Sequence, residues 1–128
     1  MANKVLIIED DVLLLTTLKE AFTKSGFEVE TANDGDIGIR IAKDSGADVV
    51  VLDLLMPKVN GLTVLENIRS SMGDWGKTVP VFILTNYDPQ DDPTMKSVLT
   101  HEPVVYLEKS SWQLEDIVGK VKQALENK

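Results

Sequence analysis

Five polar side chains lie at or near the ends of short apolar runs in this chain: Glu9, Asp10, Asp53, Thr85 and Lys109. Three of them are carboxylates, which would repel one another and raise one another's pKa if the fold brought them together. A hard divalent cation relieves such repulsion, and a site that offers only oxygen ligands suits Mg²⁺. The residue types therefore predict a magnesium site, on the condition that the chain folds so that these side chains meet.

Asp53 is the carboxylate that could act as a nucleophile. Beside Mg²⁺ and the ammonium group of Lys109, it is equipped to attack phosphorus and form an aspartyl phosphate. The cation, Lys109 and the Thr85 hydroxyl would then hold the phosphoryl oxygens. Each residue also has an ordinary structural explanation, such as a turn cap for Asp53. A helix-dipole contact accounts well for the neighbouring Asp11 and partly for Asp10. Their joint occurrence at four different run ends favours a shared site.

The apolar runs predict five β-strands. The run from Val49 to Leu52 is continuously apolar and rich in β-branched side chains, which is typical of a strand buried on both faces of a parallel sheet. The run from Phe27 to Ala32 alternates instead, which indicates a half-buried strand at or near a sheet edge. The predicted strands cover residues 5–8, 27–32, 49–53, 79–84 and 104–107.

Segments with a helical spacing of apolar side chains separate the strands. The predicted helices cover residues 12–25, 36–44, 62–71, 95–101 and 112–126. Prolines on either side keep the fourth helix short. Gly26 is expected to end the first helix, the turn Asn33-Asp34-Gly35 to cap the second, and Ser111 to cap the last. Residues 72–78 contain two glycines and are predicted to form a loop.

Strands and helices that alternate along the chain predict an α/β fold. Five strand–helix units in succession indicate a doubly wound, flavodoxin-like parallel sheet with helices on both faces. In such a sheet the carboxyl ends of the strands lie along one edge, so residues far apart in the sequence meet there. The predicted fold therefore meets the condition set by the candidate site.

Length and composition narrow the class of protein. A chain of 128 residues with 43% hydrophobic and 27% charged residues is expected to form one domain, spanning residues 1–128 without an output domain. The lack of cysteine excludes thiolate metal sites, and a single histidine excludes a multi-histidine metal centre. The net charge of -8 argues against direct binding to nucleic acid. No signal peptide or membrane-spanning segment is recognised, so a cytoplasmic location without membrane insertion is expected.

Four motifs of the chain resemble those of a known family, the receiver domains of two-component response regulators. The resemblance covers residues 5–125 and implies the (βα)5 fold of chemotaxis-Y-like proteins. Its motifs are Val5-Leu6-Ile7-Ile8-Glu9-Asp10-Asp11, Val51-Leu52-Asp53-Leu54-Leu55-Met56-Pro57 with Gly61, Ile83-Leu84-Thr85, and Tyr106-Leu107-Glu108-Lys109.

The resemblance implies a phosphoacceptor and a set of metal ligands. Asp53 would accept the phosphoryl group. Mg²⁺ would be held by Glu9, Asp10, Asp53 and the backbone carbonyl of Leu55.

The resemblance also implies which residues bind the phosphoryl group and respond to it. Thr85 and Lys109 would bind the group itself. Thr85 and Tyr106 would form a switch, in which the aromatic ring turns inward as the threonine moves toward the phosphate. The alternative for Tyr106 is a half-buried strand aromatic that uses its hydroxyl at the surface.

The implied function is a signalling switch controlled by phosphorylation. A sensor histidine kinase or a phosphotransfer protein would donate the phosphoryl group, and an output partner would bind the face formed by the fourth helix, the fifth strand and the last helix. The domain would catalyse only its own phosphorylation and dephosphorylation, so it is not classed as an enzyme. Leu55 and Tyr87 occupy positions that influence the lifetime of the phosphoryl group in this family. Neither offers a carboxylate or an amide to orient an attacking water, so a long-lived phosphoryl state is expected.

Three other functions are weighed against this one. A degenerate receiver could act as a protein-binding scaffold independent of phosphorylation, which Asn86, in place of the family's usual small residue, keeps open. A phosphohydrolase of the haloacid-dehalogenase type would need a second acid two residues after the nucleophile, where the chain has Leu55. A nucleotide- or flavin-binding module would need glycines or hydroxyls after the first strand, whereas Glu9 and Asp10 would repel phosphate.

Other positions depart from the family's pattern. Ser110 replaces the usual proline after Lys109, which favours a trans peptide bond there. The proline-broken segment 87–93 and the residues 101–103 replace the usual sequence before the fifth strand, so the output face is expected to be atypical. His101 is interpreted as a solvated residue at a helix end. Trp75 and Trp112 are interpreted as packing anchors.

Overall fold

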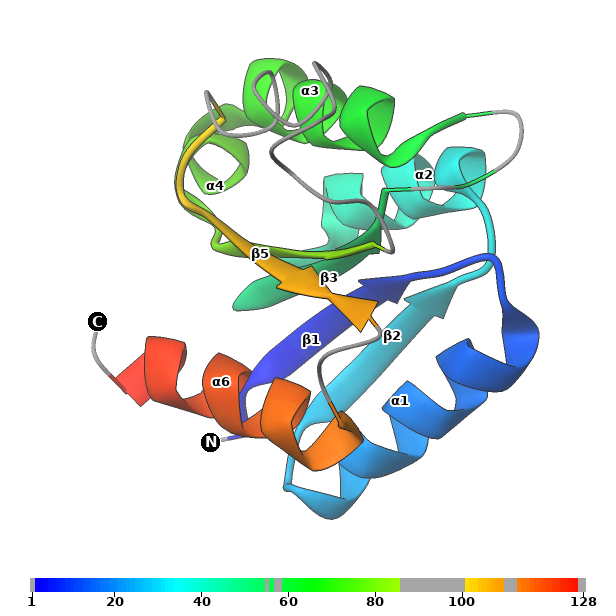
Figure 1. Cartoon of the computed structure of the whole chain (residues 1–128). Helices are drawn as coiled ribbons and strands as arrows, with labels where there is room; N and C mark the ends of the chain where they lie inside the picture. Colours follow the sequence, from blue (N-terminus) through cyan, green and yellow to red (C-terminus); the bar gives the residue numbers. More distant parts are fainter. Residues whose placement is uncertain (1, 55, 57–58, 86–100, 110–112, 127–128) are drawn as a thin grey trace.

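A computed structural model describes residues 2–54, 56, 59–85, 101–109 and 113–126 of the chain. Its five strands form one parallel sheet with the order β2-β1-β3-β4-β5 (Figure 1). The strands are β1 (Lys4–Ile8), β2 (Glu28–Ala32), β3 (Val49–Asp53), β4 (Val81–Thr85) and β5 (Val104–Glu108). The doubly wound α/β sheet predicted from the sequence is confirmed.

The register of the sheet brings the carboxyl ends of the strands to one edge. Ile8 of β1 lies opposite Leu52 of β3, and Thr85 of β4 lies opposite Glu108 of β5. The strand β3 is central, with β1 on one side and β4 on the other. Because all the strands run in the same direction, the residues that follow β1, β3 and β5 meet at this edge.

Helices cover both faces of the sheet (Figure 1). The helices are α1 (Val12–Lys24), α2 (Gly35–Ser45), α3 (Gly61–Ser71), α4 (Gly73–Thr78) and α6 (Leu114–Glu126). Leu6 and Val50 point to the face that α2, α3 and α4 cover. Ile7 and Val51 point to the face that α1 and α6 cover. The strict alternation along each strand explains why the inner strands are apolar at every position.

Polar caps fix where the helices near the carboxyl edge begin. Asp11 caps α1, Asp34 caps α2 and Asn60 caps α3, each through a side-chain oxygen that accepts hydrogen bonds from backbone N–H groups of the first turn. Gly26 has a φ of 91° just beyond α1, and Gly46 ends α2 with a φ of 60°. Both glycines adopt the left-handed conformation that commonly ends helices.

Two predictions for the elements are wrong. The segment predicted as a loop over residues 72–78 contains the short helix α4. The indole of Trp75 in this helix donates to Ala47 O at 2.7 Å, which agrees with its predicted role as a packing anchor. The strand predicted over residues 79–84 begins only at Val81. The N–H of Val79 donates to Trp75 O at the end of α4, and Pro80 has no N–H to offer a strand.

Several predictions lie outside the described residues. They concern residues 95–100 of the predicted fourth helix, the cap Ser111 and the anchor Trp112. Within the described residues, the last helix begins at Leu114. His101, predicted as a solvated helix end, is half-buried in a bend before β5. Within the described part of the chain, no helix is both long enough and apolar enough to cross a membrane.

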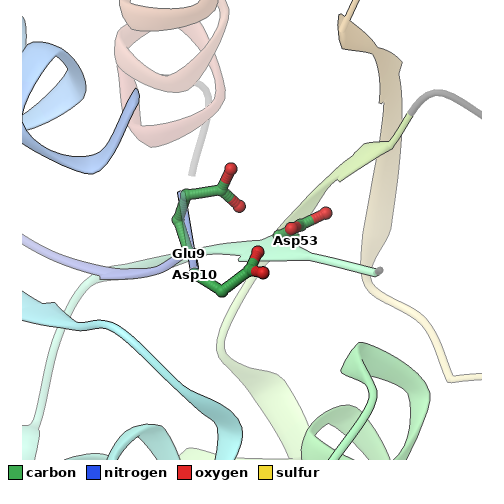
Figure 2. A group of neighbouring side chains, drawn as sticks. All are labelled: Glu9, Asp10 and Asp53. Atoms are coloured by element: carbon green, nitrogen blue, oxygen red, sulfur yellow. The ribbon is translucent and has the colours of Figure 1, made fainter. Parts of the chain in front are cut away.

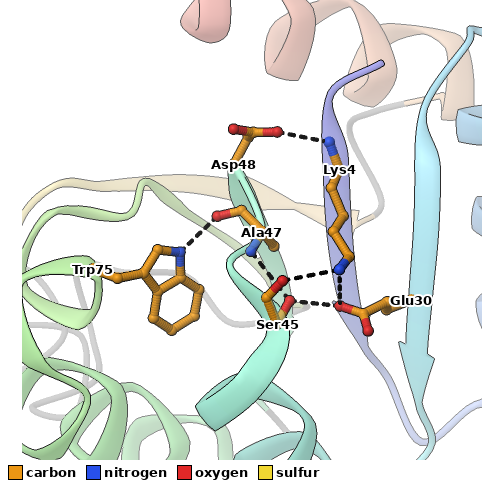
Figure 3. Close-up of polar contacts among 6 residues, drawn as sticks. All are labelled: Lys4, Glu30, Ser45, Ala47, Asp48 and Trp75. Atoms are coloured by element: carbon orange, nitrogen blue, oxygen red, sulfur yellow. Dashed lines mark hydrogen bonds and ion pairs between the residues drawn. The ribbon is translucent and has the colours of Figure 1, made fainter. Parts of the chain in front are cut away.

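The amino edge of the sheet is held by polar contacts among β1, β2 and the end of α2 (Figure 3). Lys4 Nζ donates to Ser45 O at 2.9 Å and lies 3.4 Å from Glu30 Oε1. Ser45 Oγ donates to the same Glu30 oxygen at 2.6 Å. The backbone N–H of Lys4 donates to Asp48 Oδ2 at 2.8 Å, which joins β1 to the residue before β3. These contacts fix the edge opposite the candidate site.

Arg69 ties the end of α3 to the segment that enters β5. Its Nε donates to His101 O at 3.0 Å and its Nη2 to Pro103 O at 2.9 Å. Its Nη1 donates to Gly76 O at 2.9 Å and to Val79 O at 2.8 Å. A single guanidinium therefore joins α3 to α4, to the entry of β4 and to the entry of β5.

Candidate functional site

Glu9 and Asp10 are placed by the turn between β1 and α1. The backbone N–H of Glu9 donates to Ala32 O at 3.0 Å, which extends the pairing of β1 with β2 by one residue. Asp11 then turns away, and its Oδ1 accepts from Leu13 N at 3.1 Å. The structural explanation offered for acids at this position therefore applies to Asp11, whereas Glu9 and Asp10 are left to face the end of β3.

The carboxylates of Glu9, Asp10 and Asp53 turn toward one another at the carboxyl edge of the sheet (Figure 2). One oxygen from each of them lies within 4.8 Å of the others. Glu9 is 1% exposed and Asp53 is 2% exposed, whereas Asp10 is half-buried. Three carboxylates at this spacing form an all-oxygen group in which repulsion must be offset by cations or protons.

Lys109 directly follows the edge strand β5, and its side chain reaches this group along the carboxyl edge of the sheet. Its Nζ lies 2.9 Å from Glu9 Oε1 and 3.3 Å from Asp53 Oδ1. The lysine side chain is 20% exposed, so its ammonium group is only partly solvated. In the part of the chain that the structure describes, Lys109 is therefore the one cation paired with this group of three carboxylates.

The pKa values reflect this imbalance. Burial, followed by the neighbouring carboxylate of Glu9, raises the pKa of Asp53 to about 7, although Lys109 acts in the opposite direction. Burial and the nearby Asp53 raise the pKa of Asp10 as well. Burial by itself would lower the pKa of Lys109, but its contacts with Glu9 and Asp53 outweigh that effect and raise it. The ammonium is thus firmly charged, while Asp53 is partly protonated at neutral pH.

One oxygen of Glu9 favours a cation site. Glu9 Oε2 is buried, and within the described residues it has no hydrogen-bond partner. A buried carboxylate oxygen without a partner is costly, because it has lost its water and gained nothing in return. A hard cation held by oxygen ligands would satisfy this oxygen and offset the repulsion. The donor set present therefore fits Mg²⁺.

The remaining predicted site residues are partly described. Thr85 is fully buried at the end of β4, one residue beyond Leu84, which lies opposite Asp53 in the sheet. Tyr106 is half-buried in β5 and packs against the core on the side of α2 and α3. Leu55, whose carbonyl is the fourth expected metal ligand, lies outside the described residues.

The start of α3 contributes a contact that the sequence analysis did not predict. The N–H of Gly61 donates to Leu54 O at 2.9 Å, and α3 begins directly against the backbone of Asp53. Gly61 belongs to the motif that carries the family resemblance, but nothing in its spacing indicates which backbone it approaches.

A family model described as the response regulator receiver domain matches residues 5–122. The chain belongs to this family. The receiver domain's fold and its group of acids at the carboxyl edge agree with that assignment.

Curated relatives of the receiver domain are transcriptional regulatory proteins of bacteria. Over 89 residues the chain is 43% identical to transcriptional regulatory protein QseB of Haemophilus influenzae. This match covers 70% of this chain and 38% of QseB. Over 95 residues the chain is 30% identical to the alkaline phosphatase synthesis transcriptional regulatory protein PhoP of Bacillus subtilis, covering 74% and 38%. The matched segment thus spans less than two fifths of the length of these relatives.

Solved structures share the whole fold. The chemotaxis response regulator CheY4 of Vibrio cholerae has a TM-score of 0.83 at 25% identity, covering 98% of this chain and 99% of that one. The receiver domain of a sensor histidine kinase from Pseudomonas aeruginosa, solved with a magnesium ion coordinated in its active-site cleft, has a TM-score of 0.78 at 20% identity. The similarity to the Pseudomonas structure covers 99% of this chain and 97% of that one, and it shows the fold alone.

Proposed function

We propose that this receiver domain is a phosphorylation-dependent switch in which Asp53 accepts a phosphoryl group with the help of Mg²⁺. The observation that carries the proposal is the set of three carboxylates, two of them bridged by Lys109, with one Glu9 oxygen buried and without a partner among the described residues. Lys109 pairs with the other Glu9 oxygen, Oε1, so a bound cation would satisfy the oxygen that the ion pair leaves unpartnered.

Glu9, Asp10 and Asp53 are the residues that would hold Mg²⁺, together with the carbonyl of Leu55, which the family resemblance adds. The cation would supply positive charge to the phosphoryl oxygens and favour the ionised form of Asp53. Since the pKa of Asp53 is about 7 in the metal-free protein, keeping this carboxylate ionised is a requirement for its action as a nucleophile.

The chemistry proposed for Asp53 is a single transfer. A carboxylate oxygen of Asp53 forms a bond to phosphorus, and the bond from phosphorus to the donor's nitrogen breaks. The electron pair of that bond returns to the imidazole of the donor. Lys109 is already placed between Glu9 and Asp53, so its ammonium can stabilise the charge on the phosphoryl oxygens without a large movement. Thr85 is proposed as the second phosphoryl-binding group.

The donor is proposed to be a sensor histidine kinase or a phosphotransfer protein. Val12 and Leu13 begin α1, two and three residues after Asp10, and are 62% and 78% exposed. Exposed apolar side chains beside a reacting group give a protein donor a surface on which to bind. Thr85 and Tyr106 are proposed to pass the change to an output partner. Because neither Leu55 nor Tyr87 offers a carboxylate or an amide to orient an attacking water, we expect the phosphoryl group to be long-lived. A half-life of seconds in purified protein would contradict this.

Beryllofluoride, a stable mimic of the phosphoryl group, tests the proposal without a kinase. We expect beryllofluoride to shift the ¹H–¹⁵N resonances of Asp53, Thr85 and Lys109 in the presence of Mg²⁺, and to have no effect when EDTA removes the metal. Asp53→Asn should show no shift under either condition. If the native protein binds Mg²⁺ but not beryllofluoride, the chain acts as a protein-binding scaffold and the proposed switch is wrong.

A further inference from the structure

The first residue of α3 lies against the backbone of Asp53 itself. Gly61 is buried, and a Cβ atom added to it would overlap Asp53 O and would lie 2.6 Å from Leu54 Cα. The nearest atoms are all backbone atoms, so no side-chain rotation can make room. Only glycine lets α3 approach this closely.

Neither side of this contact is free to move. Asp53 ends the central strand, and Leu54 N donates to Leu84 O at 3.2 Å on the neighbouring strand. The helix α3 is held from its other turns by Val64 and Ile68, which are fully buried. A side chain at position 61 must therefore displace either the peptide between Asp53 and Leu54 or the start of α3, in a region packed too densely to absorb the change.

The peptide between Asp53 and Leu54, which a side chain at position 61 would displace, belongs to the residue that carries the reacting carboxylate. Asp53 Oδ1 lies 3.3 Å from Lys109 Nζ. One oxygen of each of the carboxylates of Asp53, Glu9 and Asp10 lies within 4.8 Å of the other two. We propose that Gly61 is a positioning residue for Asp53, because its missing side chain allows α3 to fix the phosphoacceptor's backbone and hence the position of its carboxylate. This inference rests on the proposed function and adds to it a residue that touches neither metal nor phosphoryl group.

Gly61→Ala tests the inference with three measurements on the full chain. We expect the rate of phosphorylation by acetyl phosphate and Mg²⁺, followed by intact mass and corrected for the folded fraction, to fall about 10- to 100-fold, as for other small misplacements of reacting groups. We expect the dissociation constant for Mg²⁺, measured by calorimetry, to rise. The amide resonances of Asp53, Leu54 and Lys109 should shift in the metal-free protein.

Gly76→Ala is the matched control. A Cβ atom at Gly76 would overlap Ile68 O and would lie 2.8 Å from Met72 Cβ, so the overlap is just as severe. It lies where α3 meets α4, at the opposite end of α3 from Asp53. This variant should lose stability but keep the native rate and the native Mg²⁺ affinity once corrected for its folded fraction. A loss of rate equal to that of Gly61→Ala would overturn the proposal.

If Gly61→Ala does not fold, a milder pair of variants tests whether the start of α3 positions Asp53. Asn60 is exposed, and its Oδ1 accepts from Thr63 N at 2.9 Å to fix the first turn of α3. Asn60→Ala removes this hydrogen bond, whereas Asn60→Ser keeps a capping oxygen. We expect a several-fold slower rate for Asn60→Ala and a near-native rate for Asn60→Ser; near-native rates for both would contradict the inference.

If the proposed function is wrong, these measurements give a different set of results. In that case the native chain would gain no phosphoryl group, while the Mg²⁺ affinity and the amide shifts would still show whether Gly61 positions Asp53. Gly61→Ala with native Mg²⁺ affinity and unshifted Asp53 and Lys109 resonances would reduce Gly61 to a packing role.

Discussion

Lys109 Nζ lies 2.9 Å from Glu9 Oε1, which joins residues 100 positions apart in the sequence. The strands β3 and β4 lie between β1 and β5, so the lysine side chain crosses the carboxyl edge of the sheet over Asp53. The same ammonium also pairs with Asp53, so that among the described residues one lysine is shared by a group of three carboxylates. This sharing explains why the site is electrostatically incomplete without a cation.

Lys109→Met is expected to destabilise the metal-free protein by about 1–3 kcal/mol, because it leaves Glu9 and Asp53 buried without their cation. The loss should be larger at pH 8 than at pH 5, since the pKa of Asp53 is about 7 and a proton can neutralise this carboxylate at the lower pH. Urea denaturation in EDTA measures the effect. Lys122→Met, an exposed position on α6, is the control and should change the free energy of unfolding little. Equal effects for the two variants would contradict the proposed charge balance.

Asp53 is expected to make the metal-free protein less stable as the pH rises from about 4 to about 7. In this range the folded chain keeps a proton on Asp53, with a pKa of about 7, which the unfolded chain, with its ordinary value of 3.8, has released. The folded state therefore binds more protons, and the free energy of unfolding falls with pH by up to about 1.4 kcal/mol per pH unit from this group.

Asp53→Asn isolates this contribution. The variant cannot ionise at position 53, so it should lack this part of the pH dependence and be more stable than the native protein at pH 8 in EDTA. Denaturation curves of both proteins between about pH 4 and pH 8 measure the difference. A difference that does not grow with pH would show that burial and the neighbouring Glu9 do not raise the pKa of Asp53.

Magnesium is expected to bind more tightly as the pH rises through 7, because Asp53 must release its proton to act as a ligand. Calorimetric titration at several pH values should show affinity rising by up to tenfold per pH unit below about pH 7. At about 100 times the dissociation constant, Mg²⁺ should raise the free energy of unfolding by about 2.7 kcal/mol. Glu9→Gln removes one charge from the metal site and should weaken binding. An affinity that is independent of pH and of Glu9 would argue against this site.

Arg69→Met is expected to cost about 1–3 kcal/mol of stability, because four backbone carbonyls lose a charged donor. Arg69→Lys keeps the charge but not the fork of donors, so it should recover only part of the loss. Thermal or urea denaturation measures both. Neither variant should alter Mg²⁺ affinity, since Arg69 lies at the other end of α3 from Asp53; a change in affinity would show that the entry to β5 affects the site.

The sequence predicts the sheet and the meeting of the acids because both follow from short-range patterns. The apolar run from Val49 to Leu52 identifies a buried strand, and parallel order then places Asp53 beside the residues that follow β1. The helix α4 was missed because its six residues include two glycines and show no apolar periodicity. The contacts of Arg69 and Gly61 were missed for another reason: both are made to backbone atoms, which leave no side-chain pattern to read.

Intact mass after incubation with Mg²⁺ and acetyl phosphate is the most direct test of the account. The native chain is expected to gain the mass of one phosphoryl group, and neither Asp53→Asn nor the native chain in EDTA should gain it. Tandem mass spectrometry should place the group on Asp53. A native chain that stays unmodified with Mg²⁺ present, or an Asp53→Asn variant that is modified at the native rate, would contradict the central claim.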